Sequence, residues 1–318
     1  MNPTRLHELL QAELGRTAPA GAQALAEELA RRGGASTAAV LYYGSALRAG
    51  SLEGILDFYV LLDDVRCWPG TALARLANRW LPPNVGYLEI DHAGERLRAK
   101  FAVMSCAQFA RRLQNDARDT TIWARFCQPA LCVWSRSPAD HRAAVELVAE
   151  AVVRAGTWAA RLGPESAPAP EYWRALFAHT YGAELRVEQS ARPLDIVGKD
   201  PDRYAAILPL AWQRAGLAFT QQPGGQLRPG LDPTARQQAL RRWHRLARHG
   251  RRLNVLRLLK ASFTFEGAMD YVAWKIERHR GVRIEVKPWQ RRFPLFAAPL
   301  LYWKLRRLGV LSGGPDRH

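Results

Sequence analysis

Residues 42–45 read Tyr-Tyr-Gly-Ser, and residues 55–62 read Ile-Leu-Asp-Phe-Tyr-Val-Leu-Leu. These stretches predict a strand that ends in a Gly-Ser turn and a second strand that carries one acidic residue, Asp57. Gly44 has no Cβ, so a phosphate could approach the turn closely, where backbone N–H groups and the Ser45 hydroxyl would bind its oxygens. A carboxylate inside an apolar strand is costly unless it is paired or binds a metal. The two stretches therefore predict a phosphate-binding turn beside a metal-binding carboxylate, which is the minimal equipment for nucleotidyl transfer.

The sequence around these stretches alternates between strand-type and helix-type patterns. We expect strands at 38–43, 55–62, 85–90, 97–104 and 130–134, and helices at 4–15, 19–32, 71–80, 106–115, 120–127 and 138–162. The turn at 91–94 predicts that the third and fourth strands form a hairpin. The expected fold class is α+β, with a mixed sheet and flanking helices followed by a mainly helical C-terminal region.

Composition divides the chain into four expected parts. The Pro-containing stretch 163–170 is a plausible domain boundary, and 221–233 is rich in Gly and Pro and predicts a loop. Two basic helices are expected at 236–252 and 253–278. The predicted parts are N-terminal helices (1–36), a core domain (37–162), a helical domain (171–235), and a basic helical region (236–318).

The charge of the chain is concentrated near its C-terminus. The net charge is +17, and residues 236–307 contain 15 Arg and 4 Lys against 4 acidic residues. Such asymmetry indicates an anionic partner, and nucleic acid and anionic lipid both qualify. The alternative is a solvated basic face in an Arg-rich protein.

The remaining composition favours a cytoplasmic protein. The first residues are interrupted by charges and do not predict a signal peptide, and no run of about 18 apolar residues predicts a membrane-spanning helix. The cysteines have no CxxC spacing, so we expect reduced thiols rather than a zinc site or disulfides. They are Cys67, Cys106, Cys127 and Cys132.

Further carboxylates are candidates for a metal site with Asp57. Nucleotidyltransferases of the polymerase-beta type place two carboxylates alternately on one strand and a third on a neighbouring strand, where they hold two Mg²⁺ ions. Here Tyr59 stands where the second carboxylate would be, so Asp63 on the same strand and Glu89 between two apolar residues are the candidates. Mg²⁺ prefers such oxygen ligands. The alternatives are that Asp57 is a satisfied polar residue of the core and that Glu89 faces solvent.

Lys100 is the candidate cation of the same site. It lies on the expected strand 97–104, where it could neutralise triphosphate charge. The alternative is an edge-strand lysine that prevents aggregation.

Taken in order, Tyr43-Gly44-Ser45, Asp57 within its apolar strand, and Lys100-Phe101-Ala102-Val103 resemble the mitochondrial-type phosphatidate cytidylyltransferases, the translocator-maintenance CDP-diacylglycerol synthases. The resemblance covers about 38–135 and, more loosely, 250–310. The C-terminal match is carried by Lys260, Thr264, Gly267, Tyr271 and Lys275. Phe101-Ala102 replaces the family's Tyr-Gly, and the loop before Asp57 is short, so the chain resembles a distant bacterial-type relative.

The resemblance implies a polymerase-beta-type nucleotidyltransferase domain, followed by a winged-helix-like domain and a C-terminal amphipathic helix on the membrane. The implied reaction transfers CMP from CTP to phosphatidic acid with Mg²⁺. The implied roles are catalysis by Asp57 and Lys100; nucleotide binding by Tyr43, Gly44, Ser45 and Lys100; metal binding by Asp57, Glu89 and Asp63; and acceptor-phosphate binding by Lys260, Thr264 and Lys275.

The C-terminal segment independently favours a membrane interface. Residues 293–311 combine apolar and aromatic side chains with Lys304, Arg306 and Arg307, and Tyr302 and Trp303 suit the headgroup region. The expected location is cytoplasmic, peripheral on the inner face of the membrane. The alternative is a final helix that packs on the core.

A second function from a different class stays open. A catalytically inactive nucleotidyltransferase-like protein could bind nucleic acid through its basic C-terminal region, and Tyr59 in place of a carboxylate favours this hypothesis. Six arginines between 241 and 252, with Trp243 among them, would suit phosphate contact and base stacking.

Overall fold

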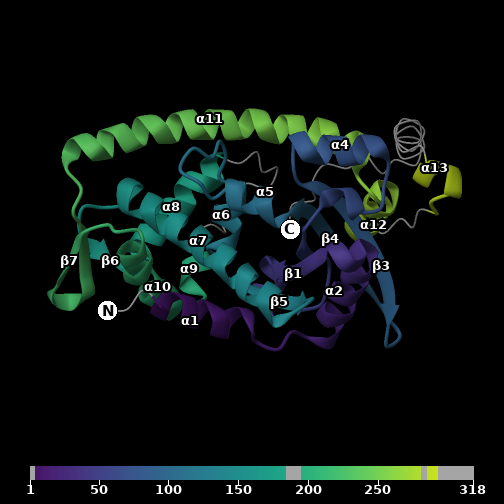
Figure 1. Ribbon diagram of the computed structural model, residues 1–318, viewed down its shortest axis with the longest axis horizontal. Coiled ribbons are helices and arrows are strands. Elements are labelled where there is room, and N and C mark those ends of the chain that lie inside the picture. The colour runs from purple at the N-terminus through teal and green to yellow at the C-terminus, as the bar shows by residue number, and fades with distance from the viewer. Residues whose placement is uncertain (1–3, 184–194, 281–284, 293–318) are drawn as a thin grey trace.

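The computed structural model describes residues 4–183, 195–280 and 285–292 and has an α+β fold with two sheets (Figure 1). The strands are β1 (Thr37–Tyr43), β2 (Leu56–Leu62), β3 (Asn84–His92), β4 (Glu95–Ser105), β5 (Ala130–Ser135), β6 (Ala167–Pro168), β7 (Phe219–Gln222) and β8 (Gln226–Pro229). The helices are α1 (Thr4–Leu14), α2 (Ala20–Gly33), α3 (Ser45–Ala49), α4 (Ala72–Trp80), α5 (Cys106–Arg111), α6 (Thr121–Phe126), α7 (Pro138–Leu162), α8 (Ala169–Ala183), α9 (Asp195–Gly198), α10 (Pro201–Arg214), α11 (Pro233–Thr264), α12 (Ala268–Arg280) and α13 (Pro288–Arg292).

The larger sheet has the strand order β3-β4-β2-β1-β5. β1 is antiparallel to both β2 and β5, β2 is parallel to β4, and β3 and β4 form an antiparallel hairpin. Ala93 and Gly94 at the tip of that hairpin both have positive φ, which the tight turn requires. The mixed sheet and the hairpin that the sequence predicts are therefore confirmed.

One face of this sheet is covered by α2. Leu25 and Leu29 of α2 are fully buried with Phe58 and Val60 of β2 in one apolar cluster. Strand residues of the opposite parity face the other way, because side chains alternate across a strand. The apolar spacing of 19–32 and 55–62 thus fixes which face of each element is buried.

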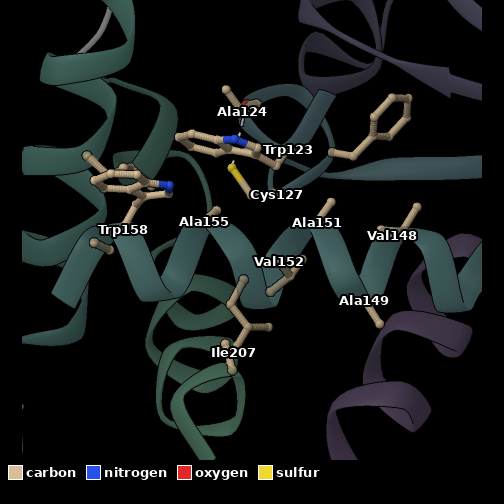
Figure 2. Packing of buried hydrophobic residues seen from close by; sticks show 14 of the residues in the cluster. Trp123, Ala124, Cys127, Val148, Ala149, Ala151, Val152, Ala155, Trp158 and Ile207 are labelled. Carbon is tan, nitrogen blue, oxygen red and sulfur yellow. Dashed lines mark hydrogen bonds between the residues drawn. The ribbon is translucent and has the colours of Figure 1, made fainter. Parts of the chain in front are cut away.

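The other face is covered by α5, α6 and α7, and its core continues into the second half of the chain. Figure 2 shows α7 at the centre of this core, with Trp123 of α6 on one side and Ile207 of α10 on the other. Ala151 and Ala155 of α7 are fully buried, and their small side chains let the neighbouring elements approach closely. Each large side chain that is fully buried there contributes about 1.5–3 kcal/mol of apolar burial.

The second half of the chain packs on α7. α8 and α10 contact α7, and the small sheet has the order β6-β8-β7. One apolar cluster runs from β1 and β2 through α7 to these helices. The two predicted domains at 37–162 and 171–235 therefore share one hydrophobic core. The boundary at 163–170 stays a prediction.

Two predicted elements are wrong in detail. The region 236–278 forms α11, a single helix of 32 residues, and then α12, rather than a break near residue 252. α11 continues because both its halves have partners: Trp243 and Leu246 are buried in the core, and Arg257 donates a hydrogen bond to the Pro82 carbonyl after α4. The predicted loop at 221–233 contains most of the β7–β8 hairpin, whose turn has positive φ at Gly224 and Gly225.

α11 lies along one edge of the molecule, from the small sheet to α4 and α12 (Figure 1). In the part of the chain that the structure describes, no helix is long and apolar enough to cross a membrane. The segment 293–311, predicted to lie in a membrane interface, falls outside the described residues.

Candidate functional site

The Gly-Ser turn joins β1 to α3, and its glycine lies against Asp57. Gly44 has a φ of +100°, which disfavours any residue with a Cβ. A Cβ at this position would lie 2.8 Å from Asp57 Oδ2. The space that glycine leaves is therefore filled by the Asp57 carboxylate. Ser45 is exposed at the first residue of α3.

Strand pairing places three predicted site residues in one row. Tyr43 is the partner of Asp57 across β1 and β2, and Asp57 is the partner of Lys100 across β2 and β4. The side chains of paired residues share a face of the sheet and lie about 5 Å apart at Cβ. The sequence-predicted Tyr43, Asp57 and Lys100 are thus brought together at one end of the sheet.

A cavity of about 150 Å³ opens beside this row, between β4 and α11. Its cationic residues are Lys100, Arg125, Arg257 and Lys260. The volume is about half the lower limit of ordinary small-molecule pockets, so it suits a group the size of a phosphate rather than a whole nucleotide. Four basic side chains around so small a space would favour an anion there, and we call it the anion cavity.

Aromatic rings form one wall of this cavity. The ring centroids of Tyr43 and Tyr59 are 5.5 Å apart, and those of Tyr59 and Phe126 are 5.1 Å apart. Tyr59 is 2% exposed, and burial raises its pKa, although the neighbouring Arg125 opposes this. Tyr59 therefore packs as a neutral core side chain at the position where the polymerase-beta pattern has its second carboxylate.

Tyr43 links the aromatic wall to the cations. Burial and the Asp57 charge raise the pKa of Tyr43 well above its ordinary value, while a hydrogen bond with Arg125 acts in the opposite direction. Arg125 also donates from Nη1 to the Thr121 carbonyl at 2.8 Å. Tyr43 stays a phenol and helps to fix the Arg125 guanidinium beside the cavity.

Behind the cavity, a buried carboxylate binds two arginines. Asp119 is 3% exposed, and its Oδ2 accepts from Arg112 Nη1 at 2.5 Å and from Arg257 Nη2 at 2.7 Å. Burial alone would raise the pKa of Asp119, but Arg257 and Arg112 outweigh it and hold the pKa below its ordinary value. This Arg-Asp-Arg cluster fixes Arg257 at the wall of the cavity.

Lys260 comes from α11 and is tied to the segment that follows α4. Its Nζ donates to the carbonyls of Leu81 at 2.7 Å and Pro83 at 2.5 Å and to Asn84 Oδ1 at 3.0 Å. Burial, followed by the charges of Arg257 and Arg112, lowers the pKa of Lys260 to about 7. Its three donors already have acceptors, so Lys260 positions the cavity wall and adds positive potential.

The three predicted metal ligands are not brought together. Asp63 is at the opposite end of β2, about 20 Å from Asp57 at 3.3 Å per residue, and pairs with Arg136 at 2.6 Å. Glu89 lies on β3, two strands from Asp57, where its Oε1 accepts from Tyr87 Oη at 2.6 Å and from Arg98 Nε at 3.3 Å. Sequence spacing alone could not show that these partners occupy both carboxylates.

Of the three predicted metal ligands, only Asp57 is left for a metal ion at this end of the sheet. Across the described ranges, no group of three or more His, Cys, Asp or Glu side chains is arranged to hold a metal ion. Asp57 by itself can serve one Mg²⁺ whose other ligands are phosphate oxygens and waters, since Mg²⁺ often uses one or two carboxylates. The three-carboxylate arrangement that a two-metal site requires is not formed by Asp57, Glu89 and Asp63.

The predicted acceptor residues are divided between α11 and α12. Thr264 lines a neighbouring cavity rather than the one beside Lys260, and its hydroxyl donates to the Lys260 carbonyl at 3.0 Å. Lys275 lies on α12, and its side chain is outside the described residues. Of this set, the structure places Lys260 at the cavity.

Gly267 has a structural role between these helices. Its φ is +73°, and a Cβ there would lie 2.6 Å from the Tyr87 carbonyl oxygen. The close approach lets the Tyr87 N–H donate to the Glu266 carbonyl at 2.8 Å. The turn between α11 and α12 is thereby joined to β3.

Sequence reasoning missed the arginines of the cavity. Arg257 is one of many arginines in α11, and nothing in its local pattern separates it from exposed neighbours such as Arg251 and Arg252. Arg125 lies in a helix whose apolar pattern dominates. A weak signal was Asp119, an acidic residue in the polar stretch before α6 that has to find a basic partner when it is buried.

The geometry stands without support from known relatives. The chain matches no known protein-family model, and it has no significant match among curated protein sequences.

Proposed function

We propose that the protein is a membrane-peripheral nucleotidyltransferase that transfers CMP from CTP to phosphatidic acid. The observation that carries the proposal is the row of Tyr43, Asp57 and Lys100 beside a phosphate-sized cavity walled by Arg125, Arg257 and Lys260. The base and the lipid acceptor come from the family resemblance, whereas the phosphate chemistry comes from this geometry.

The reaction needs positioning and charge compensation more than reactive side chains. A phosphate monoester has its second pKa near 6, so the acceptor is largely a dianion at neutral pH and needs no general base. One of its oxygens attacks the α-phosphorus of CTP, a new P–O bond forms, the bond to the bridging oxygen breaks, and pyrophosphate leaves with the electron pair. CDP-diacylglycerol is the second product.

In this proposal the cations of the cavity compensate the phosphate charges. Lys100 is exposed at the rim and would contact the triphosphate, and Arg125 would contact a phosphate inside. Arg257 is fixed in the cavity wall by its ion pair with Asp119. Lys260 is fixed there by its hydrogen bonds to the Leu81 and Pro83 carbonyls. Asp57 would hold a Mg²⁺ bound with the nucleotide, which neutralises developing charge on the leaving pyrophosphate.

The direct test is pyrophosphate release from the purified full-length protein with Mg²⁺ and each nucleoside triphosphate, with and without phosphatidic-acid vesicles. We expect release with CTP when the vesicles are present. Asp57→Asn keeps the shape of the side chain and removes its charge, so it should lower the rate by at least about 100-fold, which corresponds to about 2.7 kcal/mol of the barrier.

Asp63→Asn is the matched control because it makes the same change on the same strand, at the end paired with Arg136. It should retain the wild-type rate. Equal rates for both variants would remove Asp57 from the site, and release without vesicles or with every nucleotide would contradict the proposed acceptor and base.

A second candidate function, nucleic-acid binding, rests on the exposed arginines of α11. They are Arg241, Arg242, Arg245, Arg248, Arg251 and Arg252. Trp243, expected to stack on bases, is 3% exposed and packs with its ring centroid 5.3 Å from that of Trp158, so it is not available for stacking. A steep salt dependence of RNA binding without Mg²⁺ would support this alternative.

A further inference from the structure

α4 has an inverted amphipathic pattern. Its inward-facing Asn78 is 2% exposed and donates to the Val103 carbonyl at 3.0 Å. Its large apolar side chains point outward: Leu73 is 60% exposed, Leu76 57% and Trp80 79%. The spacing of these three residues, i, i+3 and i+7, places them on one side of the helix. A helix of a globular protein normally buries such a stripe.

The C-terminal half of α11 repeats this pattern beside α4. Leu256, Leu259 and Phe263 have the same i, i+3, i+7 spacing, and each is at least half exposed. The two helices contact each other along the upper edge of the molecule (Figure 1). We name these six residues the α4–α11 apolar face: Leu73, Leu76, Trp80, Leu256, Leu259 and Phe263.

On the same side of α11, the helical turns before Leu256 carry arginine side chains. Counting back from Leu256 by three and four residues reaches Arg252, Arg248, Arg245 and Arg241, all of them exposed. Exposed carboxylates that could neutralise this run are missing from α11 itself, because residues 233–264 contain no Asp or Glu. The apolar face is therefore continuous with a strip of positive charge.

We propose that the α4–α11 apolar face, together with the arginine run that precedes it on α11, docks the protein on an anionic lipid bilayer. Leucine, tryptophan and phenylalanine side chains would enter the boundary between headgroups and acyl chains, and the arginines would contact the anionic headgroups. This surface consists of described residues and includes none of the predicted C-terminal segment 293–311.

The composition of the face favours lipid over RNA. Single-stranded RNA is bound by aromatic stacking and basic grooves, whereas Leu73, Leu76, Leu256 and Leu259 offer aliphatic surface that a base cannot use well. Lipid also explains why the two chemical characters adjoin, since the bilayer boundary is apolar next to a negatively charged layer.

The face and the anion cavity share the same turns of α11. Arg257 and Lys260 line the cavity, while Leu256 and Leu259 beside them in the chain are exposed. Docking would bring the cavity close to the headgroup layer. That consequence rests on the proposed transfer reaction, whereas docking itself needs neither nucleotide nor turnover.

The test is flotation of the full-length protein with phosphatidylcholine vesicles, with and without phosphatidylglycerol, in the absence of nucleotide. We expect binding to the anionic vesicles. Leu76→Ser and Leu259→Ser should each weaken it by about tenfold, because each removes the burial of one leucine. Arg248→Gln should weaken it about fivefold on anionic vesicles alone.

Matched controls make the same substitution at exposed leucines elsewhere. Leu9→Ser on α1 and Leu240→Ser near the start of α11 change side chains that are 39% and 38% exposed, and both should leave binding unchanged. Brominated phospholipid should quench wild-type tryptophan fluorescence, and Trp80→Phe should remove a larger part of this quenching than Trp289→Phe.

Three outcomes would overturn the proposal. The first is flotation that none of the face variants weakens. The second is no flotation by the full chain but flotation after deletion of residues 293–318, which would show that the chain's own C-terminal segment covers the face. The third is tight RNA binding with no flotation on either vesicle. In each of these outcomes, transfer to a soluble phosphatidic acid by the wild type would leave the proposed function intact.

Discussion

The anion cavity places charged side chains inside the protein, whereas the outer surface of α4 and α11 exposes apolar ones. Each is the reverse of what a globular protein usually shows. The cavity and the ion cluster behind it hold Arg112, Asp119, Arg257 and Lys260 where apolar side chains would be expected. The outer surface instead presents Leu76 and Trp80 to solvent. Both arrangements cost stability compared with the usual one. Proteins retain such arrangements at functional sites, which is why we assign an anion to the first and a lipid bilayer to the second.

The comparison also separates two ways of compensating an unfavourable side chain. In the cavity each buried charge has a partner inside the protein, as Lys260 has with three acceptors. On the α4–α11 apolar face no described residue covers Trp80, which is 79% exposed, and a lipid bilayer is the partner that we propose for it. Substitutions of the buried charges should therefore change folding stability, and substitutions on the apolar face should change membrane binding.

The largest effect is expected for Asp119→Ala. It would leave Arg112 and Arg257 buried without their shared carboxylate, which typically costs about 3–5 kcal/mol. The free energy of unfolding in urea measures this loss. Asp64→Ala is the control: it removes an exposed ion pair with Arg66 and a cap on the Arg66 N–H, so its loss should be well below that of Asp119→Ala. An equal loss of unfolding free energy in both variants would show that the buried ion cluster stabilises the fold no more than an exposed ion pair does.

The same cluster has a pH signature. Because the folded-state pKa of Asp119 lies below its unfolded value, its contribution to stability is present above about pH 4 and is lost as the pH falls through the folded pKa. Asp119→Asn should flatten the acid limb of the stability curve. An acid limb unchanged from wild type would contradict this assignment.

A smaller effect on stability is expected for Gly44→Ala, with a larger one on transfer. The change places a Cβ at a φ of +100° and 2.8 Å from Asp57 Oδ2, so backbone strain of about 1–3 kcal/mol adds to displacement of the carboxylate. Pyrophosphate release should fall at least about tenfold. Gly50→Ala is the matched control, since its φ is +64° but a Cβ there meets no atom within 4 Å. It should lose stability and keep activity, and equal activity in both variants would break the link between Gly44 and Asp57.

The smallest effect concerns the protonation of Lys260. Its pKa of about 7 means that the folded protein loses this proton while the unfolded chain keeps it, so its contribution makes stability rise with pH from about 7 to about 10. An anion in the cavity favours the charged form. The affinity for sulfate should therefore fall about fivefold between pH 6 and pH 8, as for the loss of roughly 1 kcal/mol of charge interaction.

Lys260→Arg keeps its charge across this range and should bind sulfate without the pH dependence. Sulfate suits the titration because its own charge is constant there. A wild-type profile as flat as that of the arginine variant would show that Lys260 does not titrate beside the anion.

Much of the larger sheet could be predicted from the sequence because its signals are local. Alternation places Phe58 and Tyr59 on opposite faces, and the turn at 91–94 predicts the β3–β4 hairpin. The row of Tyr43, Asp57 and Lys100 also follows from strand parity once the strand order is known. The strand order itself depends on pairing between distant segments, for which one sequence carries little signal.

The rest depends on contacts between segments that are far apart in the chain. Arg257 contacts Asp119 across 138 residues, and Lys260 contacts Leu81 across 179 residues. Periodicity cannot distinguish these two side chains from the exposed basic residues of the same helix. For the same reason, Asp63 and Glu89 resemble metal ligands in the sequence although Arg136 and Arg98 occupy them in the structure.

The most direct test of the central claim is calorimetric binding of inorganic pyrophosphate to the wild type, Lys100→Met and Arg251→Met. Both substitutions remove one exposed positive charge, at the rim of the cavity and on α11 away from it, respectively. The account predicts one pyrophosphate per chain, at least about tenfold weaker binding by Lys100→Met, and wild-type affinity for Arg251→Met. Equal weakening by the two variants, or weakening by Arg251→Met alone, would place the anion on the basic surface and contradict the cavity as the phosphate site.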